Sequence, residues 1–141
     1  PRWSDLMVAS VPKDAEALWL DIHGGAPFAS IRRSRCGETF AYLKIESGAE
    51  PMLVDDRGAI EDAINAPLRE AKAGCVISGG TGRCYSYIDL ALTDVPRAAE
   101  IIRERLRTAN IPKRSWILFH DAALDFEWIG LHEDIPPPPR D

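Results

Sequence analysis

The chain has 141 residues, of which 45% are hydrophobic and 28% charged, and a formal net charge of −5 at pH 7. This length suits a single domain that buries roughly two thirds of its unfolded surface. The acidic balance provides no overall attraction to phosphate backbones or anionic membranes, so we expect no nucleic-acid partner. No apolar run approaches the roughly 20 residues that cross a bilayer, so we expect a soluble, cytoplasmic protein without membrane contact.

The first 39 residues are expected to form an extension that packs on a sheet. Residues 15–22 contain an apolar cluster, and His23-Gly24-Gly25 marks a turn. Residues 28–32 then have the composition of a strand. Together these segments predict an added hairpin that extends or covers the sheet.

A strand is predicted over 40–46 and a short one over 51–54, followed by a helix. The helix is indicated by apolar residues at helical spacing, Ile60, Ile64, Leu68 and Ala71. Pro67 removes the amide that would bond to Ala63, which predicts a kink or restart near Asn65-Ala66. Gly74 is expected to end this helix.

The next segment predicts a β-hairpin. Residues 75–78 and 84–93 are β-prone, and Gly79-Gly80 supplies the positive-φ residues of a tight turn between them. Such a turn would set Cys75 opposite Cys84, where a disulfide is sterically possible but disfavoured in the cytosol.

The second strand of this hairpin alternates between two faces. Its apolar residues Ile88, Leu90 and Leu92 share the face expected to enter the core. Tyr85, Tyr87 and Asp89 share the other face. That second face is predicted to be open unless the N-terminal segment or a partner covers it.

A helix over about 95–109 follows, capped by Thr93 or Asp94 and tolerating Pro96 in its first turn. Residues 116–120 predict a buried strand, and residues 126–132 a further edge strand. The proline run at 136–139 favours an extended, frayed tail.

Residues 40–121 thus read strand, helix, strand, strand, helix, strand. This order is that of the ferredoxin-like split βαβ (βαββαβ) fold, an α+β architecture with both helices on one face of an antiparallel sheet. We expect one domain over residues 1–141, comprising the extension 1–39, a core 40–132 and a tail 133–141. The fold itself hosts many unrelated functions, and no motif identifies a particular family.

Glycine amides in the segment Gly79-Gly80-Thr81-Gly82 could form an anion-binding concavity, with Arg83 pairing with a phosphate. The segment lacks the Lys-Ser/Thr ending of a P-loop and leads into a strand, so a plain hairpin turn is the competing interpretation. Tyr85 and Tyr87 could stack on a partner, but Asp89 beside them would repel phosphate.

His120 and Asp121, with Asp125 and Glu127 after them, offer acid-base groups at a strand end. No nucleophile motif accompanies them, and His23 and His132 have no supporting pattern. Cys36, Cys75 and Cys84 form no CxxC pair, so we predict no metal site and no cofactor.

The leading hypothesis is a non-enzymatic protein-binding module of regulatory or inhibitor (immunity) type, with a possible homodimer. Its binding surface would be the open face, or the acidic surface that contains Asp121, Asp125, Glu127, Glu133 and Asp134. One alternative is a sensor of an anionic metabolite that uses the Gly79–Gly82 hairpin. A second is an acid-base enzyme that uses His120 and Asp121.

Overall fold

A six-stranded sheet, antiparallel at every strand pair, organises the molecule in the computed structural model. The structure describes residues 3–47, 54–109, 111, 114–132 and 134–139. Strands run in the order β1-β3-β4-β2-β5-β6, with β2 and β3 parallel to one another on either side of β4. The strands are β1 (Leu6–Ser10), β2 (Thr39–Glu46), β3 (Gly74–Gly82), β4 (Tyr85–Leu92), β5 (Ser115–Phe119) and β6 (Trp128–Gly130).

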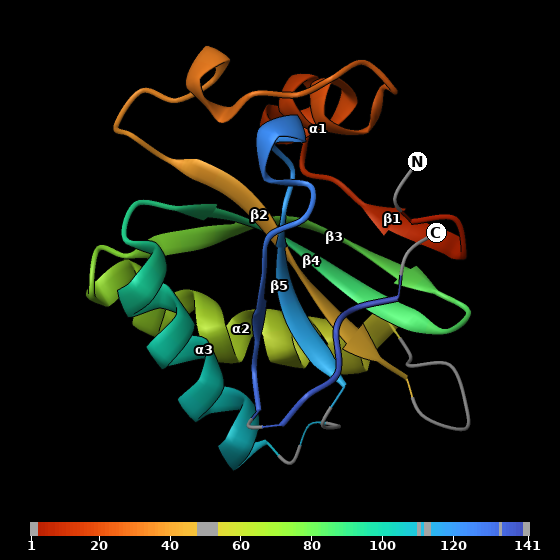
Figure 1. Ribbon diagram of the computed structural model, residues 1–141, viewed down its shortest axis with the longest axis vertical. Helices are drawn as coiled ribbons and strands as arrows, with labels where there is room; N and C mark the ends of the chain where they lie inside the picture. Colours follow the sequence, from red (N-terminus) through yellow and green to blue (C-terminus); the bar gives the residue numbers. More distant parts are fainter. Residues whose placement is uncertain (1–2, 48–53, 110, 112–113, 133, 140–141) are drawn as a thin grey trace.

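Among the residues described, three α-helices flank the sheet, with α1 (Glu16–His23) on one side and α2 (Val54–Glu70) and α3 (Val95–Thr108) on the other (Figure 1). The predicted core face is confirmed, because Ile88, Leu90 and Leu92 of β4 are buried against α2 and α3. Short 3-10 helices span Lys13–Ala15, Ser30–Arg32 and Ala122–Leu124. None of the helices in the described ranges has the length and apolarity that a membrane crossing requires.

The predicted start of α3 is confirmed. The Asp94 side chain accepts a hydrogen bond from the Arg97 amide at 3.2 Å, and Pro96 lies in the first turn, where its missing amide costs nothing. The apolar spacing places Ala98, Ile102 and Leu106 in the core. The strand expected at 116–120 and the edge strand expected within 126–132 are β5 and β6.

α2 continues through Pro67 to Glu70, so the restart that was one of the two predicted alternatives near Asn65-Ala66 does not occur. Pro67 lies in the last turn, so it removes one helical hydrogen bond without dividing the element. The chain leaves the helix before Gly74, which begins β3. Of the short strand predicted over 51–54, residues 51–53 lie outside the described residues, and Val54 is the first residue of α2.

The prediction of a tight turn at Gly79-Gly80 is wrong. Gly79 and Gly80 lie inside β3, opposite Ile88 and Tyr87, and the chain reverses at Arg83-Cys84. The glycines leave space for neighbouring side chains, since a Cβ on Gly80 would lie 3.2 Å from Trp3 Cζ3, and one on Gly79 would lie 2.5 Å from Glu61 Oε1. Cys75 consequently faces Ala91, not Cys84, and both thiols are free.

The N-terminal extension packs on the sheet, but not as a hairpin. Its first strand, β1, extends the sheet by pairing with β3, and the apolar cluster at residues 15–22 belongs to helix α1. Leu18 and Ile22 of that helix pack against Phe28 and Phe40. An apolar run of this length suits a helix or a strand, so the sequence pattern alone does not distinguish the two.

The C-terminal tail contacts the same side of the sheet as the extension. The Trp116 indole Nε1 donates a hydrogen bond to the Pro136 carbonyl oxygen at 2.8 Å, and Trp116 is completely buried. The start of the proline run is therefore attached to β5, where the sequence predicted a frayed end.

Candidate functional site

The sheet face that carries Tyr87 and Asp89 is closed, which is the outcome expected if the N-terminal segment covers it. Each of these residues is 1% exposed, and Tyr85 is half-buried. The Trp3 ring stacks on the Tyr87 ring at a centroid distance of 4.5 Å and an interplanar angle of 13°. The N-terminal segment is the cover that the prediction allowed for, so the two tyrosines are packing residues and not an exposed docking platform.

Asp5 holds this cover in place. Its carboxylate accepts hydrogen bonds from the backbone amides of Cys84 at 2.8 Å and Tyr85 at 3.0 Å, and from the Tyr87 hydroxyl. Partial burial raises the pKa of Asp5, but these three hydrogen bonds outweigh it and leave the pKa below its usual value. Gly82 makes room for this carboxylate beside the strand.

Beneath Trp3, three segments that are distant in sequence bring together two imidazoles and a carboxylate. His23 ends α1, Asp89 lies in β4, and His120 directly follows β5. His120 Nε2 lies 2.6 Å from Asp89 Oδ1, and His23 Nε2 lies 3.5 Å from Asp89 Oδ2. We call these three residues the His-Asp-His cluster.

The cluster is shielded from solvent. The side chains of His23, Asp89 and His120 are 10%, 1% and 2% exposed. Aromatic rings surround it, with the Trp3 centroid 4.3 Å from that of His23 and the Tyr42 centroid 4.7 Å from that of His120. Charges in such a setting interact more strongly than at the surface, because little water screens them.

Asp89 remains ionised despite its burial. Desolvation raises its pKa, but hydrogen bonds and charge interactions with His120 and His23 more than reverse this, and the pKa lies well below its usual value. Ser78 adds a further donor, with its hydroxyl 2.7 Å from Asp89 Oδ2. A buried carboxylate of this kind needs cationic character beside it, supplied by a protonated imidazole or by a bound cation.

The acid-base pair predicted from the sequence does not assemble. His120 points to Asp89, whereas Asp121 accepts a hydrogen bond from the Ser30 amide at 3.0 Å and another from the Ser30 hydroxyl. Adjacent residues of an extended chain point to opposite sides, which separates these two groups. Asp121 thus serves to hold the loop containing Ser30 against the end of β5.

Gly79, Gly80 and Arg83 do not form the predicted anion cradle. Gly79 and Gly80 are buried in a strand that is paired on both sides, by β1 and β4, so their amides belong to the sheet. Arg83 is exposed at the reversal, where its amide donates to the Asp5 carbonyl at 3.0 Å. The metabolite-sensor hypothesis therefore loses the geometry on which it depended.

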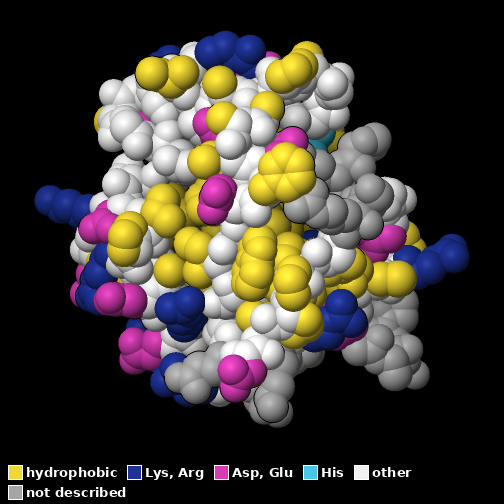
Figure 2. Space-filling model, in the orientation of Figure 1, with side chains coloured by type: hydrophobic (Ala, Val, Ile, Leu, Met, Phe, Trp, Pro, Cys, Tyr) yellow, Lys and Arg dark blue, Asp and Glu magenta, His cyan; other side chains and the backbone are white. Residues whose placement is uncertain are grey.

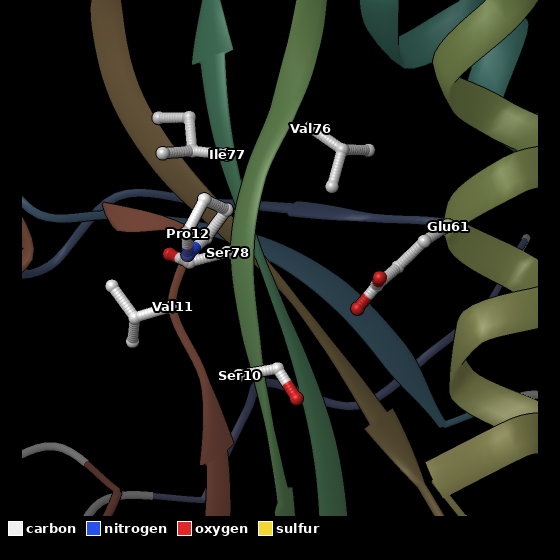
Figure 3. Close-up of a pocket in the computed structure, with 7 residues that line it drawn as sticks. All are labelled: Ser10, Val11, Pro12, Glu61, Val76, Ile77 and Ser78. Atoms are coloured by element: carbon white, nitrogen blue, oxygen red, sulfur yellow. The ribbon is translucent and has the colours of Figure 1, made fainter. Parts of the chain in front are cut away.

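A pocket of about 310 Å³ lies between β1, β3 and α2, lined by Ser10, Val11, Pro12, Glu61, Val76, Ile77 and Ser78. Glu61 reaches into it from α2 (Figure 3). Burial raises the pKa of Glu61, although neighbouring Arg57 opposes the shift. Arg57 is 2% exposed and donates to Glu61 at 3.0 Å, Thr81 at 2.7 Å and Ser10 at 2.8 Å, which ties β1 and β3 to α2.

A second candidate site is exposed and lies around the start of β6. Phe126 is 73% exposed and Trp128 is 38% exposed, and the acidic residues Asp125 and Glu127 beside them are exposed as well. We call residues 125–128 the aromatic edge. Hydrophobic side chains gather in the middle of the face shown in Figure 2, over the C-terminal strand and tail.

Sequence reasoning missed the His-Asp-His cluster because its members lie far apart in the chain, 66 residues between His23 and Asp89 and 31 between Asp89 and His120. The available signal was Asp89 itself. A carboxylate in the middle of a central, strongly apolar strand requires a buried partner.

No family model, curated protein or solved structure matches this chain.

Proposed function

We propose that this protein is a non-enzymatic binding module that docks a basic protein partner on the aromatic edge. The observation that carries the proposal is the exposure of Phe126 and Trp128, at 73% and 38%. Large aromatic side chains dominate the energetics of protein interfaces, and their exposure in the free protein leaves apolar area to be buried on binding.

The charges around these two rings favour a basic partner. Asp125 and Glu127 flank Phe126, and the whole chain carries a net charge of −5. Complementary charge accelerates encounter and sets the orientation, while the aromatic side chains supply the affinity. The fitting partner has an apolar pocket with a lysine- and arginine-rich rim, as a basic enzyme or toxin neutralised by a small acidic inhibitor would have.

We expect a partner to bind the side chains of the aromatic edge and not to add a strand to the sheet beside β6. β6 has three residues, and Arg103 of α3 donates to the Gly130 carbonyl at 2.8 and 3.2 Å, which caps part of the free edge. Partners that add a strand rely on unpaired main-chain groups. We therefore expect recognition through Phe126 and Trp128.

We further assign residues 40–121 to the ferredoxin-like fold. The order β3-β4-β2-β5, with β2 and β3 parallel and the connecting helices α2 and α3 on one face, supports this assignment. β1 and β6 extend that four-stranded arrangement at its two edges. The fold presents the aromatic edge but does not by itself imply a function.

The test uses the full chain immobilised as bait in a lysate of the native host, at low and high salt. The matched variants are Phe126→Ala with Trp128→Ala, and Met7→Ala as the control, since Met7 is 52% exposed on the opposite edge strand β1. We expect the parent chain and the Met7→Ala control to capture a stoichiometric basic protein. The variants altered at Phe126 and Trp128 should bind it more weakly. Loss of about 2 kcal/mol at a hot spot would weaken binding by roughly 30-fold.

Three results would contradict the proposal: no stoichiometric partner, equal retention by both sets of variants, or a partner without a basic surface. Light scattering of the free protein measures its mass and so tests whether a second copy of the chain binds the aromatic edge. A dimer that Phe126→Ala dissociates would make the aromatic edge a self-association surface instead. The exposed position of Phe126 keeps the folding stability of that variant within about 0.5 kcal/mol of the parent.

A further inference from the structure

We propose that His23, Asp89 and His120 form a binding site for a divalent transition metal ion, with Zn²⁺ as the ion that fits best. One ligating atom from each residue lies within 4.8 Å of the other two. This inference is independent of the aromatic edge, which lies on different residues, and either proposal can fail without the other.

The donor set restricts the ion to a divalent transition metal. Two imidazole nitrogens and one carboxylate oxygen are the ligands of many zinc sites that keep a fourth position open. Mg²⁺ and Ca²⁺ prefer sites made only of oxygen, and Cu(I) prefers sulfur. The described residues place no thiol in the cluster, so the nitrogen-rich set favours Zn²⁺.

The spacing of the donors is close to what a zinc ion requires. Ligands about 2.0–2.2 Å from a tetrahedral ion lie roughly 3.3–3.6 Å from one another. His23 Nε2 lies 3.5 Å from Asp89 Oδ2, whereas His120 Nε2 faces Oδ1, so the ion would bind both carboxylate oxygens or the carboxylate would turn to present one of them. His120 Nε2 and Asp89 Oδ1 are 2.6 Å apart, so this pair must separate by less than about 1 Å to admit the ion.

The surroundings favour a bound cation. Asp89 is buried, and the Ser78 hydroxyl lies 2.7 Å from its Oδ2, which orients the carboxylate from outside the ligand set. Trp3, Tyr42 and Tyr87 form one buried aromatic group beside it. His23 is the most exposed of the three side chains, at 10%, and so marks the route by which an ion would enter.

A metal in this position would fasten the N-terminal extension to the sheet. His23 comes from α1, whereas Asp89 and His120 come from β4 and the end of β5. An ion that binds only the folded arrangement stabilises it by mass action. The expected role is therefore structural, and the competing explanation is a metal-free hydrogen-bonded network of the same three side chains.

The first experiment uses the full chain after removal of metals with a chelator. Calorimetric titration should give one Zn²⁺ per chain, with no binding of Mg²⁺ under the same conditions, and Zn²⁺ should raise the melting temperature. In ¹⁵N-histidine NMR spectra, the ring nitrogens of His23 and His120 should shift on Zn²⁺ addition. His132 lies outside the cluster, and its signals should stay in place.

The second experiment compares His23→Gln with His132→Gln. Glutamine can still donate a hydrogen bond to Asp89 but is a poor zinc ligand, so His23→Gln should weaken Zn²⁺ binding by about 100-fold or more. His132→Gln should bind as the parent does. If His23→Gln fails to fold by circular dichroism, the NMR titration of the unaltered chain decides.

The inference is overturned if the parent chain binds no Zn²⁺ at a one-to-one ratio. It is equally overturned if Zn²⁺ binds without moving the signals of His23 and His120, or if the two glutamine variants bind alike. Each of these outcomes would leave the cluster as a hydrogen-bonded network that only packs the extension onto the sheet.

Discussion

Replacing Gly79 with alanine tests the close packing of β3 against α2. An alanine Cβ would lie 2.5 Å from Glu61 Oε1, 3.0 Å from the Tyr87 carbonyl oxygen and 3.1 Å from Arg57 Nε. The Glu61 carboxylate can move aside. The Tyr87 carbonyl belongs to the neighbouring strand β4 and cannot move without disturbing the hydrogen bonds between β3 and β4. Gly79 is not among the glycines with positive φ, so the cost is steric and not conformational.

The expected magnitude follows from two opposing effects. Overpacking of this kind lowers the free energy of unfolding by about 1–3 kcal/mol. Alanine also reduces the conformational entropy of the unfolded chain, which raises the free energy of unfolding by about 0.5 kcal/mol. We expect Gly79→Ala to lower the free energy of unfolding by about 1.5 kcal/mol, which corresponds to a fall in Tm of about 5 °C for a chain of this size. Urea unfolding followed by tryptophan fluorescence measures the first quantity, and the m-value should stay unchanged.

Gly58 supplies the matched control within the same chain. It lies in α2 with no atom within 4 Å of an added Cβ, so Gly58→Ala should stabilise the protein by about 0.5–1 kcal/mol. Combining Gly79→Ala with Glu61→Ala should recover part of the loss, with a coupling energy of at least about 0.5 kcal/mol. A neutral Gly79→Ala, or additive effects of the two substitutions, would refute the packing described for β3 and α2.

Two further predictions concern the polar contacts that hold β1 in place. Asp5→Asn should destabilise the protein by about 1–2 kcal/mol at pH 7, because the ionised carboxylate accepts from the Tyr87 hydroxyl and two amides. The folded-state pKa of Asp5 is lowered, so this stability is present above about pH 4 and is lost as the pH falls. Unfolding curves of parent and variant should therefore converge in acid, and a constant gap would contradict the assignment. Arg57→Met should cost about 3 kcal/mol, since it leaves Thr81, Ser10 and half-buried Glu61 without their donor. Thr81→Val should cost about 1 kcal/mol by the same urea assay. Equal costs for these two variants would show that Arg57 is not the centre of the network.

Local patterns were enough to predict the elements whose signals do not depend on distant partners. The alternation in β4 placed Ile88, Leu90 and Leu92 in the core, and a capping aspartate with helical apolar spacing located α3. Both signals arise within one turn or one strand of the chain, so the sequence contains all the physics they need. The β5 strand followed from its continuous apolar run in the same way.

Tertiary contacts decided the rest. A glycine that permits a tight turn and a glycine that admits a neighbouring side chain look the same in sequence, and only Trp3, Leu6 and Glu61 distinguish them here. The same holds for Asp89, whose ionisation, burial and two histidine neighbours depend on segments that fold from opposite parts of the chain. Sequence by itself determined which residues could be buried and in which local element; the tertiary structure decided which of them meet, because contacts between distant segments form only when the whole sheet closes.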